Sequence, residues 1–177
     1  MGTVVYTDGA CRGNPGPGGW AWAIDLGPGA AGRNGVGGAA NTTNQRMEVT
    51  AAWRAVQGIE GPLEIRSDST YVVNCFRNRW HESWIRRGWK NSQRQPVANR
   101  DLWEPFIELV LGRGDVTFTW VKGHSGDRMN DVVDELAVQA SHDPSTWETP
   151  TVADGEIRSG STAQESLFGV TGPDTLF

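Results

Sequence analysis

Cysteine is scarce in this sequence, and long hydrophobic runs are missing altogether. The 177 residues include two cysteines, Cys11 and Cys75, which are too few and too far apart for a disulfide framework or a zinc site. No stretch of 18 apolar residues is present, which argues against a membrane-spanning helix, and the N-terminus has no secretory signal pattern. We therefore expect two free thiols in a cytoplasmic protein that does not contact membranes.

Basic residues are almost missing from the last part of the chain. Residues 143–177 contain six acidic residues and a single basic one, Arg158, whereas residues 1–142 contain 15 of each kind. The formal net charge of −5 therefore comes from the last segment, whose content of Pro, Ser, Thr and Gly is typical of disorder. We expect one domain over residues 1–142 and an acidic, flexible C-terminal tail over residues 143–177.

Positive charge gathers in one internal stretch. Between residues 77 and 100, Glu82 is the single acid beside seven basic side chains: Arg77, Arg79, Arg86, Arg87, Lys90, Arg94 and Arg100. Such a stretch is often no more than a solvated helix face, but it is also typical of a phosphate-binding surface. The stretch is therefore a candidate for contact with a nucleic acid.

The first 60 residues predict strands followed by a helix. Residues 3–8 and 20–26 have strand character, and the run of Gly and Pro over residues 13–19 predicts the turn of a hairpin between them. A third strand is expected over residues 30–38. Apolar residues then recur at helical spacing over residues 43–59, and we predict a capping box formed by Thr42 and Gln45.

The remaining elements alternate between strand and helix. We expect a strand at 63–67, a helix at 69–78, helical segments interrupted at Gly88 and Pro96, a helix at 99–111, a strand at 115–121 and a helix at 127–140. The order β-β-β-α-β-α-β-α predicts an α/β fold, with a five-stranded mixed sheet and helices on both of its faces. Four further residues are expected in the core: Trp53, Cys75, Trp103 and Trp120.

Four carboxylates stand at the edges of apolar segments, where a solvated surface acid has no special reason to be. Asp8 ends the first strand, Glu48 lies in the opening turns of the first helix, Asp68 follows the strand at 63–67, and Asp134 lies on the last helix. If the first and fourth strands are neighbours, Asp8 and Asp68 lie side by side. A single Asp at a strand end is usually a cap, but four converging carboxylates need protons or hard divalent cations to offset their repulsion. Two magnesium or manganese ions held in this way would flank a scissile phosphate.

Two other catalytic motifs are excluded because the sequence lacks the residues that they require. The glycine run at residues 13–19 precedes a strand and lacks the Gly-Lys-Ser/Thr ending of a phosphate-binding loop. In the sequence GHSGD at residues 123–127, Asp127 stands where the nucleophile elbow of a serine hydrolase needs glycine.

Four segments carry a resemblance to a known family: YTDGACRGNPGPGGWAW, TTNQRMEVTAA, SDSTYVVN and WVKGHSGDRMNDVVDELA. In order and spacing, over roughly residues 3–140, they resemble the motifs of type 1 ribonucleases H of the bacterial kind. The resemblance implies the ribonuclease H-like fold and a magnesium-dependent endonuclease that hydrolyses the RNA strand of RNA/DNA hybrids, leaving 5′-phosphate and 3′-hydroxyl ends. We also expect the chain to act as a monomer, with manganese as a possible alternative to magnesium.

The resemblance assigns roles at the catalytic centre. It identifies four metal-binding carboxylates, Asp8, Glu48, Asp68 and Asp134. His124 resembles a catalytic histidine that shuttles protons or helps to release the product, a role suited to an imidazole that titrates near neutral pH.

The resemblance also assigns the substrate contacts. Asn14, Asn44 and Gln45 resemble the polar residues that read 2′-hydroxyl groups in the minor groove. The backbone groups of Cys11, Arg12 and Gly13 belong to the same set. Thr43 and Asn99 resemble contacts to phosphates of the DNA strand, and Thr70 is a further substrate position. The segment at residues 80–90 resembles a basic protrusion over the DNA strand, with contacts from Trp80, Trp84, Arg86, Arg87, Trp89 and Lys90. Thr70 stands where an amide is common, Gln45 stands where a different amide is common, and Asp131 replaces a glutamate.

The C-terminal tail contains a short pattern of its own. Residues 164–168, QESLF, resemble the peptide by which bacterial replication and repair proteins bind the DNA sliding clamp, with Gln164, Leu167 and Phe168 as the anchors. A five-residue pattern also arises by chance, so a plain solvated tail is an equal alternative.

Two functions therefore remain open. The first is hydrolysis of hybrids formed by replication primers or by transcription. The second is a non-catalytic hybrid-binding module that its tail recruits to the sliding clamp. The presence of all four carboxylates favours the nuclease. Resolvases and transposases also have acidic metal sites, but they lack the other motifs.

Overall fold

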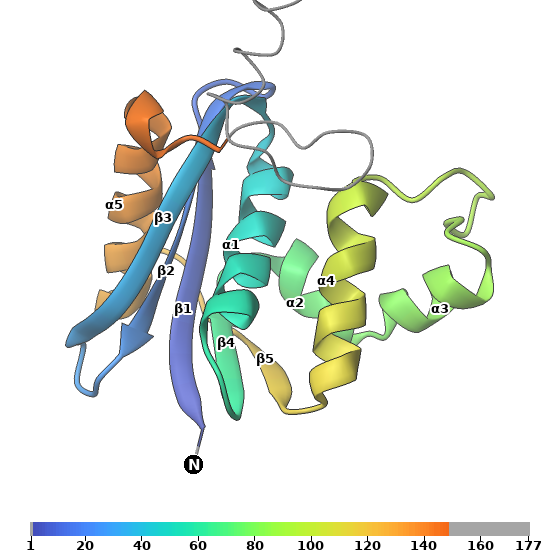
Figure 1. Cartoon of the computed structure of the whole chain (residues 1–177), viewed down its shortest axis with the longest axis horizontal. Helices are drawn as coiled ribbons and strands as arrows, with labels where there is room; N and C mark the ends of the chain where they lie inside the picture. Colours follow the sequence, from blue (N-terminus) through green and yellow to red (C-terminus); the bar gives the residue numbers. More distant parts are fainter. Residues whose placement is uncertain (1, 149–177) are drawn as a thin grey trace, which may run out of the picture. The chain divides into compact units, whose positions relative to one another are not determined.

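Residues 2–148 are described in a computed structural model, which contains a five-stranded sheet with helices on both faces (Figure 1). The strands are β1 (Thr3–Cys11), β2 (Gly16–Asp25), β3 (Ala31–Thr42), β4 (Leu63–Ser67) and β5 (Val116–Trp120). Their order in the sheet is β3-β2-β1-β4-β5. The pairs β1–β2 and β2–β3 are antiparallel, whereas β1–β4 and β4–β5 are parallel. The predicted mixed sheet is therefore confirmed.

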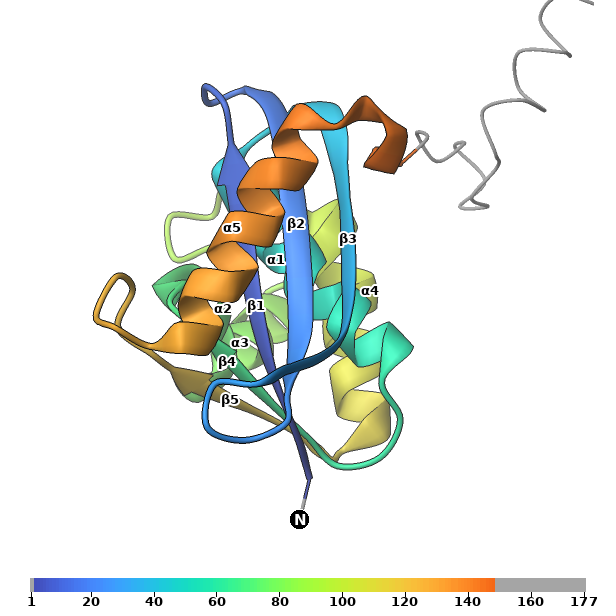
Figure 2. The ribbon, with the colours of Figure 1, turned by 90° about the vertical axis from the view of Figure 1, so that its left-hand side faces the viewer.

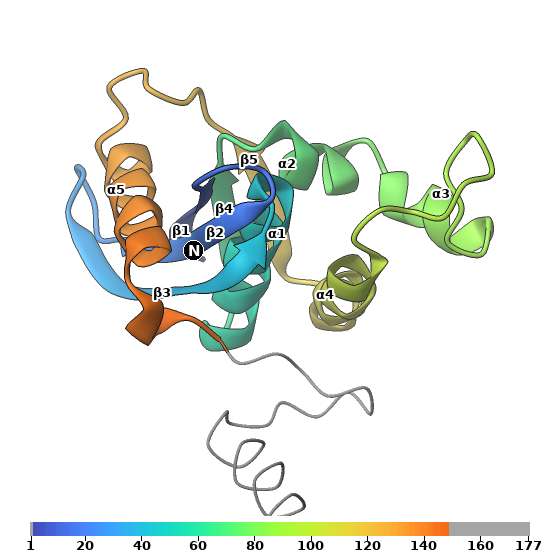
Figure 3. The ribbon, with the colours of Figure 1, turned by 90° about the horizontal axis from the view of Figure 1, so that it is seen from above.

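The helices lie in two layers. They are α1 (Asn44–Gly58), α2 (Thr70–Arg77), α3 (Trp80–Arg86), α4 (Arg100–Arg113), α5 (Arg128–His142) and the short 3-10 helix η1 (Pro144–Thr146). Helix α5 covers one face of the sheet across β1, β2 and β3 (Figure 2). Helices α1 to α4 lie on the opposite side, where α3 projects beyond α4 (Figure 3), whereas η1 contacts β3 and α5. None of the helices in residues 2–148 has the length and apolar character needed to cross a membrane.

The alternation of side chains along β1 divides the core in two. Val5 points toward α1 and belongs to the larger cluster, which also contains the fully buried Trp103 and Phe106 of α4. Tyr6 points the other way, into a smaller cluster with Met129 and Val133 of α5. Because successive side chains in a strand face opposite sides, Asp8 lies on the same face of β1 as Tyr6, toward α5.

Local details differ from the sequence prediction in several places, among them the start of β2 at Gly16, inside the predicted turn at residues 13–19, and the end of β3 at Thr42. The side chain of Thr43, not Thr42, caps α1 by accepting a hydrogen bond from the Arg46 backbone N–H at 3.2 Å, so the predicted capping box is wrong by one residue. Strand β1 continues to Cys11, because its pairing with β2 extends beyond Asp8. Trp120 is 43% exposed, so its predicted place in the core is wrong: β5 is an edge strand, and α5 packs on the other end of the sheet.

Ordered packing continues past residue 142. The η1 turn is followed by Trp147, which forms a bridge to Gly38 of β3 and donates a hydrogen bond from Nε1 to the Ala140 carbonyl at 2.9 Å. The compact unit therefore reaches Trp147, where the sequence had suggested a boundary at 142. The predicted clamp-binding residues Gln164, Leu167 and Phe168 lie outside the described residues.

Candidate active site

The parallel pairing of β1 with β4 brings Asp8 and Asp68 to the same edge of the sheet. The paired register runs as far as Tyr6 and Arg66. Asp8 and Asp68 each follow these partners by two residues, so both side chains emerge on the α5 side. Asp8 is buried, whereas Asp68 is half-buried just after the end of β4. The predicted neighbourhood of these two carboxylates is therefore present in the sheet.

Glu48 reaches this edge from α1 because Gly9 lets the helix approach β1 closely. A Cβ atom on Gly9 would overlap the backbone of Met47 and Glu48. Two donors then hold the Glu48 carboxylate: Asn44 Nδ2 donates to Oε1 at 2.9 Å, and Ser69 Oγ donates to Oε2 at 2.6 Å. The side chain is consequently fixed in orientation at the side of the site.

Helix α5 contributes Asp134 and an unpredicted neighbour, Asn130. The two residues are four apart, so they lie on one face of the helix. Asn130 is 1% exposed, and its Nδ2 donates a hydrogen bond to Asp68 Oδ2 at 3.3 Å. Its Oδ1 has no hydrogen-bond partner within residues 2–148. Asn130 thus ties the helix that carries Asp134 to the carboxylate at the end of β4.

The four carboxylates interact electrostatically around Asp8. Burial away from water raises the pKa of Asp8 to about 8, with further increases from the charges of Asp68, Asp134 and Glu48. The Gly9 backbone N–H, which donates to Asp8 Oδ1 at 2.7 Å, lowers it in part. Burial likewise raises the pKa of Glu48, an effect that its hydrogen bonds from Ser69 and Asn44 oppose. The site therefore favours added positive charge.

The donor set fits hard divalent cations, because magnesium and manganese prefer carboxylate oxygens. Asp8, Glu48, Asp68 and Asp134 would hold them. Within residues 2–148, however, no three His, Cys, Asp or Glu side chains are already arranged as a metal-binding group. Both Glu48 oxygens and one oxygen each of Asp8 and Asp68 accept hydrogen bonds from protein donors, which orient these carboxylates and leave further lone pairs for a cation.

His124 lies in the loop between β5 and α5, next to this cluster. The loop approaches Asp68 through Gly123, where an added Cβ would come within 2.5 Å of Asp68 Oδ2. His124 itself is exposed and has a left-handed backbone, with φ of 52°. Its imidazole is therefore accessible to a ligand at the edge of the carboxylate cluster.

The residues predicted to read 2′-hydroxyl groups gather where the β1–β2 turn meets the start of α1. Asn14 Oδ1 accepts from the Asn44 backbone N–H at 3.2 Å, and the Cys11 thiol donates to the Thr42 carbonyl at 3.4 Å. Gly13 and Gln45 are exposed in the same two segments. The Arg12 backbone lies in the same turn, while its side chain donates from Nε to the Ser141 carbonyl at the end of α5, at 3.0 Å.

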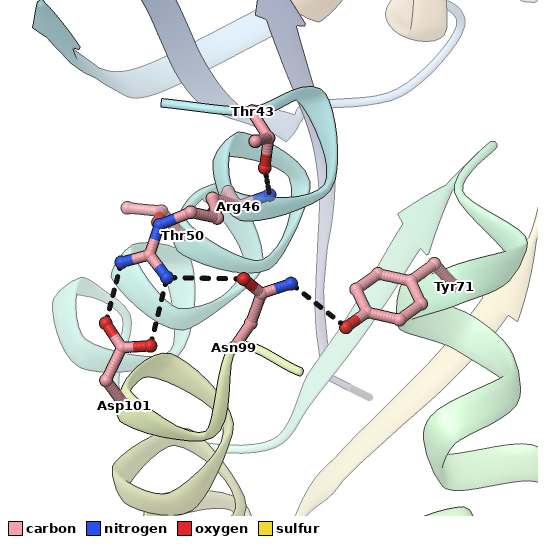
Figure 4. A network of polar contacts seen from close by, with 6 residues as sticks. All are labelled: Thr43, Arg46, Thr50, Tyr71, Asn99 and Asp101. Carbon is pink, nitrogen blue, oxygen red and sulfur yellow. Dashed lines mark hydrogen bonds and ion pairs between the residues drawn. The ribbon is translucent and has the colours of Figure 1, made fainter. Parts of the chain in front are cut away.

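A polar network joins the two residues predicted to contact DNA phosphates (Figure 4). Thr43 caps the helix turn that carries Arg46, and Arg46 forms a two-pronged ion pair with Asp101, at 2.6 and 2.9 Å. Arg46 Nη1 also donates to Asn99 Oδ1 at 3.3 Å, and Asn99 Nδ2 donates to the Tyr71 hydroxyl at 3.2 Å. The amide of Asn99 is therefore held with its nitrogen toward Tyr71. Thr70, beside Tyr71, is exposed.

The predicted basic protrusion consists of α3 and the loop after it. Its tryptophans pack on one another and on the larger core cluster: Trp84 lies 6.3 Å from Trp80, 6.2 Å from Trp89 and 5.6 Å from Trp103 between ring centroids. Its cations face outward instead, since Arg86, Arg87 and Lys90 are exposed. Arg87, Lys90 and Arg94 line a cavity of about 560 Å³ together with Asn91 and Ser92.

Three polar residues of the site were missed by sequence reasoning: Tyr6, Ser69 and Asn130. Asn130 was detectable, because it precedes Asp134 by one helical turn. Ser69 adjoins Asp68, but its bond to Glu48 depends on the packing of α2 against α1, which no local pattern reveals. The contacts of Tyr6 could not be predicted, because they depend on the register in which β1 pairs with β4.

Comparisons with known proteins show what this chain is similar to. Residues 1–142 match the family described as RNase H. A ribonuclease H of Syntrophomonas wolfei is 47% identical over 140 residues, which cover 77% of this chain and 94% of the relative. The crystal structure of LC9-RNase H1, described as a type 1 RNase H with the type 2 active-site motif, is 28% identical, has a TM-score of 0.67 and covers 93% of this chain and 80% of its own. LC11-RNase H1, solved in complex with an RNA/DNA hybrid, shares the fold at 22% identity with a TM-score of 0.60, over 79% of this chain and 96% of its own.

Proposed function

The chain belongs to the ribonuclease H family, and from this premise we propose that it hydrolyses the RNA strand of RNA/DNA hybrids by two-metal-ion catalysis. The single observation that carries the proposal is the electrostatic coupling of Asp8 with Asp68, Asp134 and Glu48 in one partly buried site. Two bound magnesium ions would activate the attacking water and stabilise the leaving oxygen. This chemistry leaves a 5′-phosphate and a 3′-hydroxyl group.

The remaining residues of the site bind, orient and move protons. Asn130 and Ser69 hold Asp68 and Glu48 in place, at 3.3 and 2.6 Å. The exposed His124, in the loop that approaches Asp68 through Gly123, would accept or deliver a proton at the departing product. Manganese would substitute for magnesium, because both prefer oxygen ligands.

Recognition of the hybrid would use two surfaces on the α1 side of the site. The turn that carries Asn14 and the start of α1 with Asn44 lie together and would read the 2′-hydroxyl groups that distinguish RNA from DNA. Thr43 and Asn99 would bind a phosphate of the DNA strand, and the exposed cations Arg86, Arg87 and Lys90 would bind further along it. We also propose that the enzyme acts as a monomer, because all four carboxylates come from one chain, and that it acts in the cytoplasm.

The assay that tests this proposal compares three substrates of one sequence. The chain should cleave a labelled RNA/DNA hybrid in the presence of magnesium and leave the same RNA intact both as a single strand and as an RNA duplex. Cleavage of all three at equal rates would contradict the proposed specificity. No cleavage of the hybrid with either magnesium or manganese would favour a non-catalytic hybrid-binding module.

Recruitment to the sliding clamp remains a separate prediction from the sequence at residues 164–168. We expect the full chain to bind a bacterial clamp and the variant with Leu167→Ala and Phe168→Ala to lose that binding. Equal capture of both proteins in a pull-down with purified clamp would contradict binding through Leu167 and Phe168.

A further inference from the structure

A hydrogen-bonded triad lies beneath the carboxylate cluster. The Tyr6 hydroxyl donates to Asp127 Oδ2 at 3.0 Å and accepts from Arg66 Nη1 at 3.3 Å. Tyr6 is 4% exposed, and the Arg66 guanidinium lies over its ring at 5.8 Å from the centroid. The three residues come from β1, β4 and the start of α5, so one hydroxyl group joins three elements.

Tyr6 and Arg66, the two members of the triad on strands, each precede one of the carboxylates by two residues. Tyr6 and Arg66 are paired Cα partners in the parallel ladder of β1 and β4. Asp8 and Asp68 each follow by two residues, which brings them to the same face about 6.6 Å further along the sheet. Whatever fixes Tyr6 against Arg66 therefore also fixes the lateral position of Asp8 against Asp68.

Asp127, the member of the triad at the start of α5, lies on nearly the same side of that helix as Asp134. Asp127 caps α5, and its Oδ1 accepts from the backbone N–H groups of Met129 and Asn130 at 3.1 and 3.2 Å. Asp134 follows Asp127 by seven residues, close to two helical turns, so it returns to nearly the same side of α5. Because Oδ2 of Asp127 accepts from Tyr6, both carboxylate oxygens are engaged, and the start of the helix is fixed against β1.

Arg66 is itself restrained. Its Nε donates to Glu64 Oε1 at 2.9 Å, within an ion pair between half-buried side chains. This pair directs the guanidinium toward Tyr6 and Glu64. A free arginine two residues before Asp68 would instead be drawn to the anionic cluster, where it would compete with divalent cations.

We propose that Tyr6 is a positioning residue, whose hydroxyl aligns the β1, β4 and α5 carboxylates for divalent cation binding by holding Arg66 and Asp127. This inference rests on the proposed function, but it concerns residues outside the cation-binding set. It predicts that loss of one hydroxyl group disturbs the carboxylate geometry while the surfaces that bind the hybrid stay intact.

The test uses the full chain with two single variants and their combination. Tyr6→Phe keeps the aromatic ring and removes both hydrogen bonds, and Asp127→Ser keeps a side chain that caps helices well but is too short to reach Tyr6. Each should lower kcat about five- to tenfold, as expected for one or two lost hydrogen bonds, with KM for the hybrid unchanged. The double variant should be no slower than the slower single one, because both remove the same contact.

A readout that is independent of cleavage is the magnesium dependence of the melting temperature. The magnesium concentration that gives half of the stabilisation should rise about five- to tenfold in Tyr6→Phe. The matched control is Ser141→Ala, which removes a buried hydroxyl group, bonded to the Val138 carbonyl at 2.6 Å, at the far end of α5. It should lower the melting temperature without changing the magnesium midpoint or kcat.

The outcomes separate this inference from the proposed function. Failure of the unmodified chain to cleave hybrids contradicts the proposed function, and the magnesium midpoint still tests the role of Tyr6. A Tyr6→Phe protein that melts earlier, but has a magnesium midpoint and kcat within twofold of the unmodified chain, would overturn the inference and leave the triad a purely structural contact.

Discussion

Asp8 in β1 lies close to Asp68, which directly follows the end of β4, and after burial the charge of Asp68 makes the largest charged contribution to the raised pKa of Asp8. The repulsion between them is present in the folded chain and absent in the unfolded one. This repulsion therefore lowers the free energy of unfolding, and bound cations would offset the loss.

The first prediction concerns Asp8→Asn in the absence of metal. A carboxyl group whose folded-state pKa is raised stabilises the fold fully below its unfolded pKa, near 4, and this stabilisation is lost as pH rises through about 8. The asparagine side chain is neutral throughout this pH range, so the Asp8→Asn variant does not lose stability in this way as pH rises. We expect Asp8→Asn to exceed the unmodified chain in the free energy of unfolding by on the order of 3 kcal/mol at pH 8, with little difference at pH 4.

Urea unfolding with a chelator at several pH values provides the measurement. Glu108→Gln is the matched control, since Glu108 is an exposed carboxylate on α4, and it should have no comparable effect. Addition of magnesium should narrow the difference between Asp8→Asn and the unmodified chain. A difference that stayed constant between pH 4 and pH 8 would contradict the burial and repulsion assigned to Asp8.

The second prediction concerns Asn130→Ala. The variant removes the donor to Asp68 Oδ2 from a position that is 1% exposed. We expect kcat to fall about tenfold or more and KM for the hybrid to stay within twofold, because the hydrogen bond orients a carboxylate of the site and not the hybrid. Steady-state kinetics at saturating magnesium would show this, and an unchanged kcat would mean that Asp68 needs no such support.

The third prediction concerns the Arg46–Asp101 ion pair. Arg46→Met would release the amide of Asn99 from its fixed orientation and should weaken hybrid binding about three- to tenfold, with a smaller effect on kcat. Arg54→Met, two turns further along α1, is the control. Equal dissociation constants for both variants, measured in calcium to prevent cleavage, would show that Asn99 does not depend on Arg46.

The sequence predicted the order of the sheet elements well because hydrophobic periodicity and turn residues are local signals. The strand at 63–67 agrees residue for residue with β4. The exposure of Trp120 could not be predicted, since it depends on which strands α5 covers. The capping residue was misassigned between Thr42 and Thr43 because either threonine fits the local pattern.

The candidate site was predictable in its carboxylates and less so in their supports. Asp8, Glu48, Asp68 and Asp134 stand out by type and by position in the sequence. The bond between Tyr6 and Asp127 joins residues 121 apart, and only the parallel register of β1 and β4 brings Arg66 to them. Such contacts follow from tertiary packing, which a single sequence does not display.

The fourth prediction concerns the cations of the protrusion. Replacing the exposed Arg86, Arg87 and Lys90 with Gln should reduce the slope of log affinity for the hybrid against log salt by up to about 3, with each lost phosphate contact removing close to one unit. Binding titrations between low and moderate salt would measure the slope. An unaltered slope would mean that these three side chains do not contact the phosphates of the hybrid.

The measurement that tests the central claim most directly is magnesium-dependent hybrid cleavage by Asp8→Asn and Asp68→Asn, made together with hybrid binding by the same proteins. We predict that each variant loses at least about a hundredfold in cleavage rate and binds the hybrid as tightly as the unmodified chain. Cleavage at the unmodified rate by either variant would contradict the assignment of these carboxylates to the metal site.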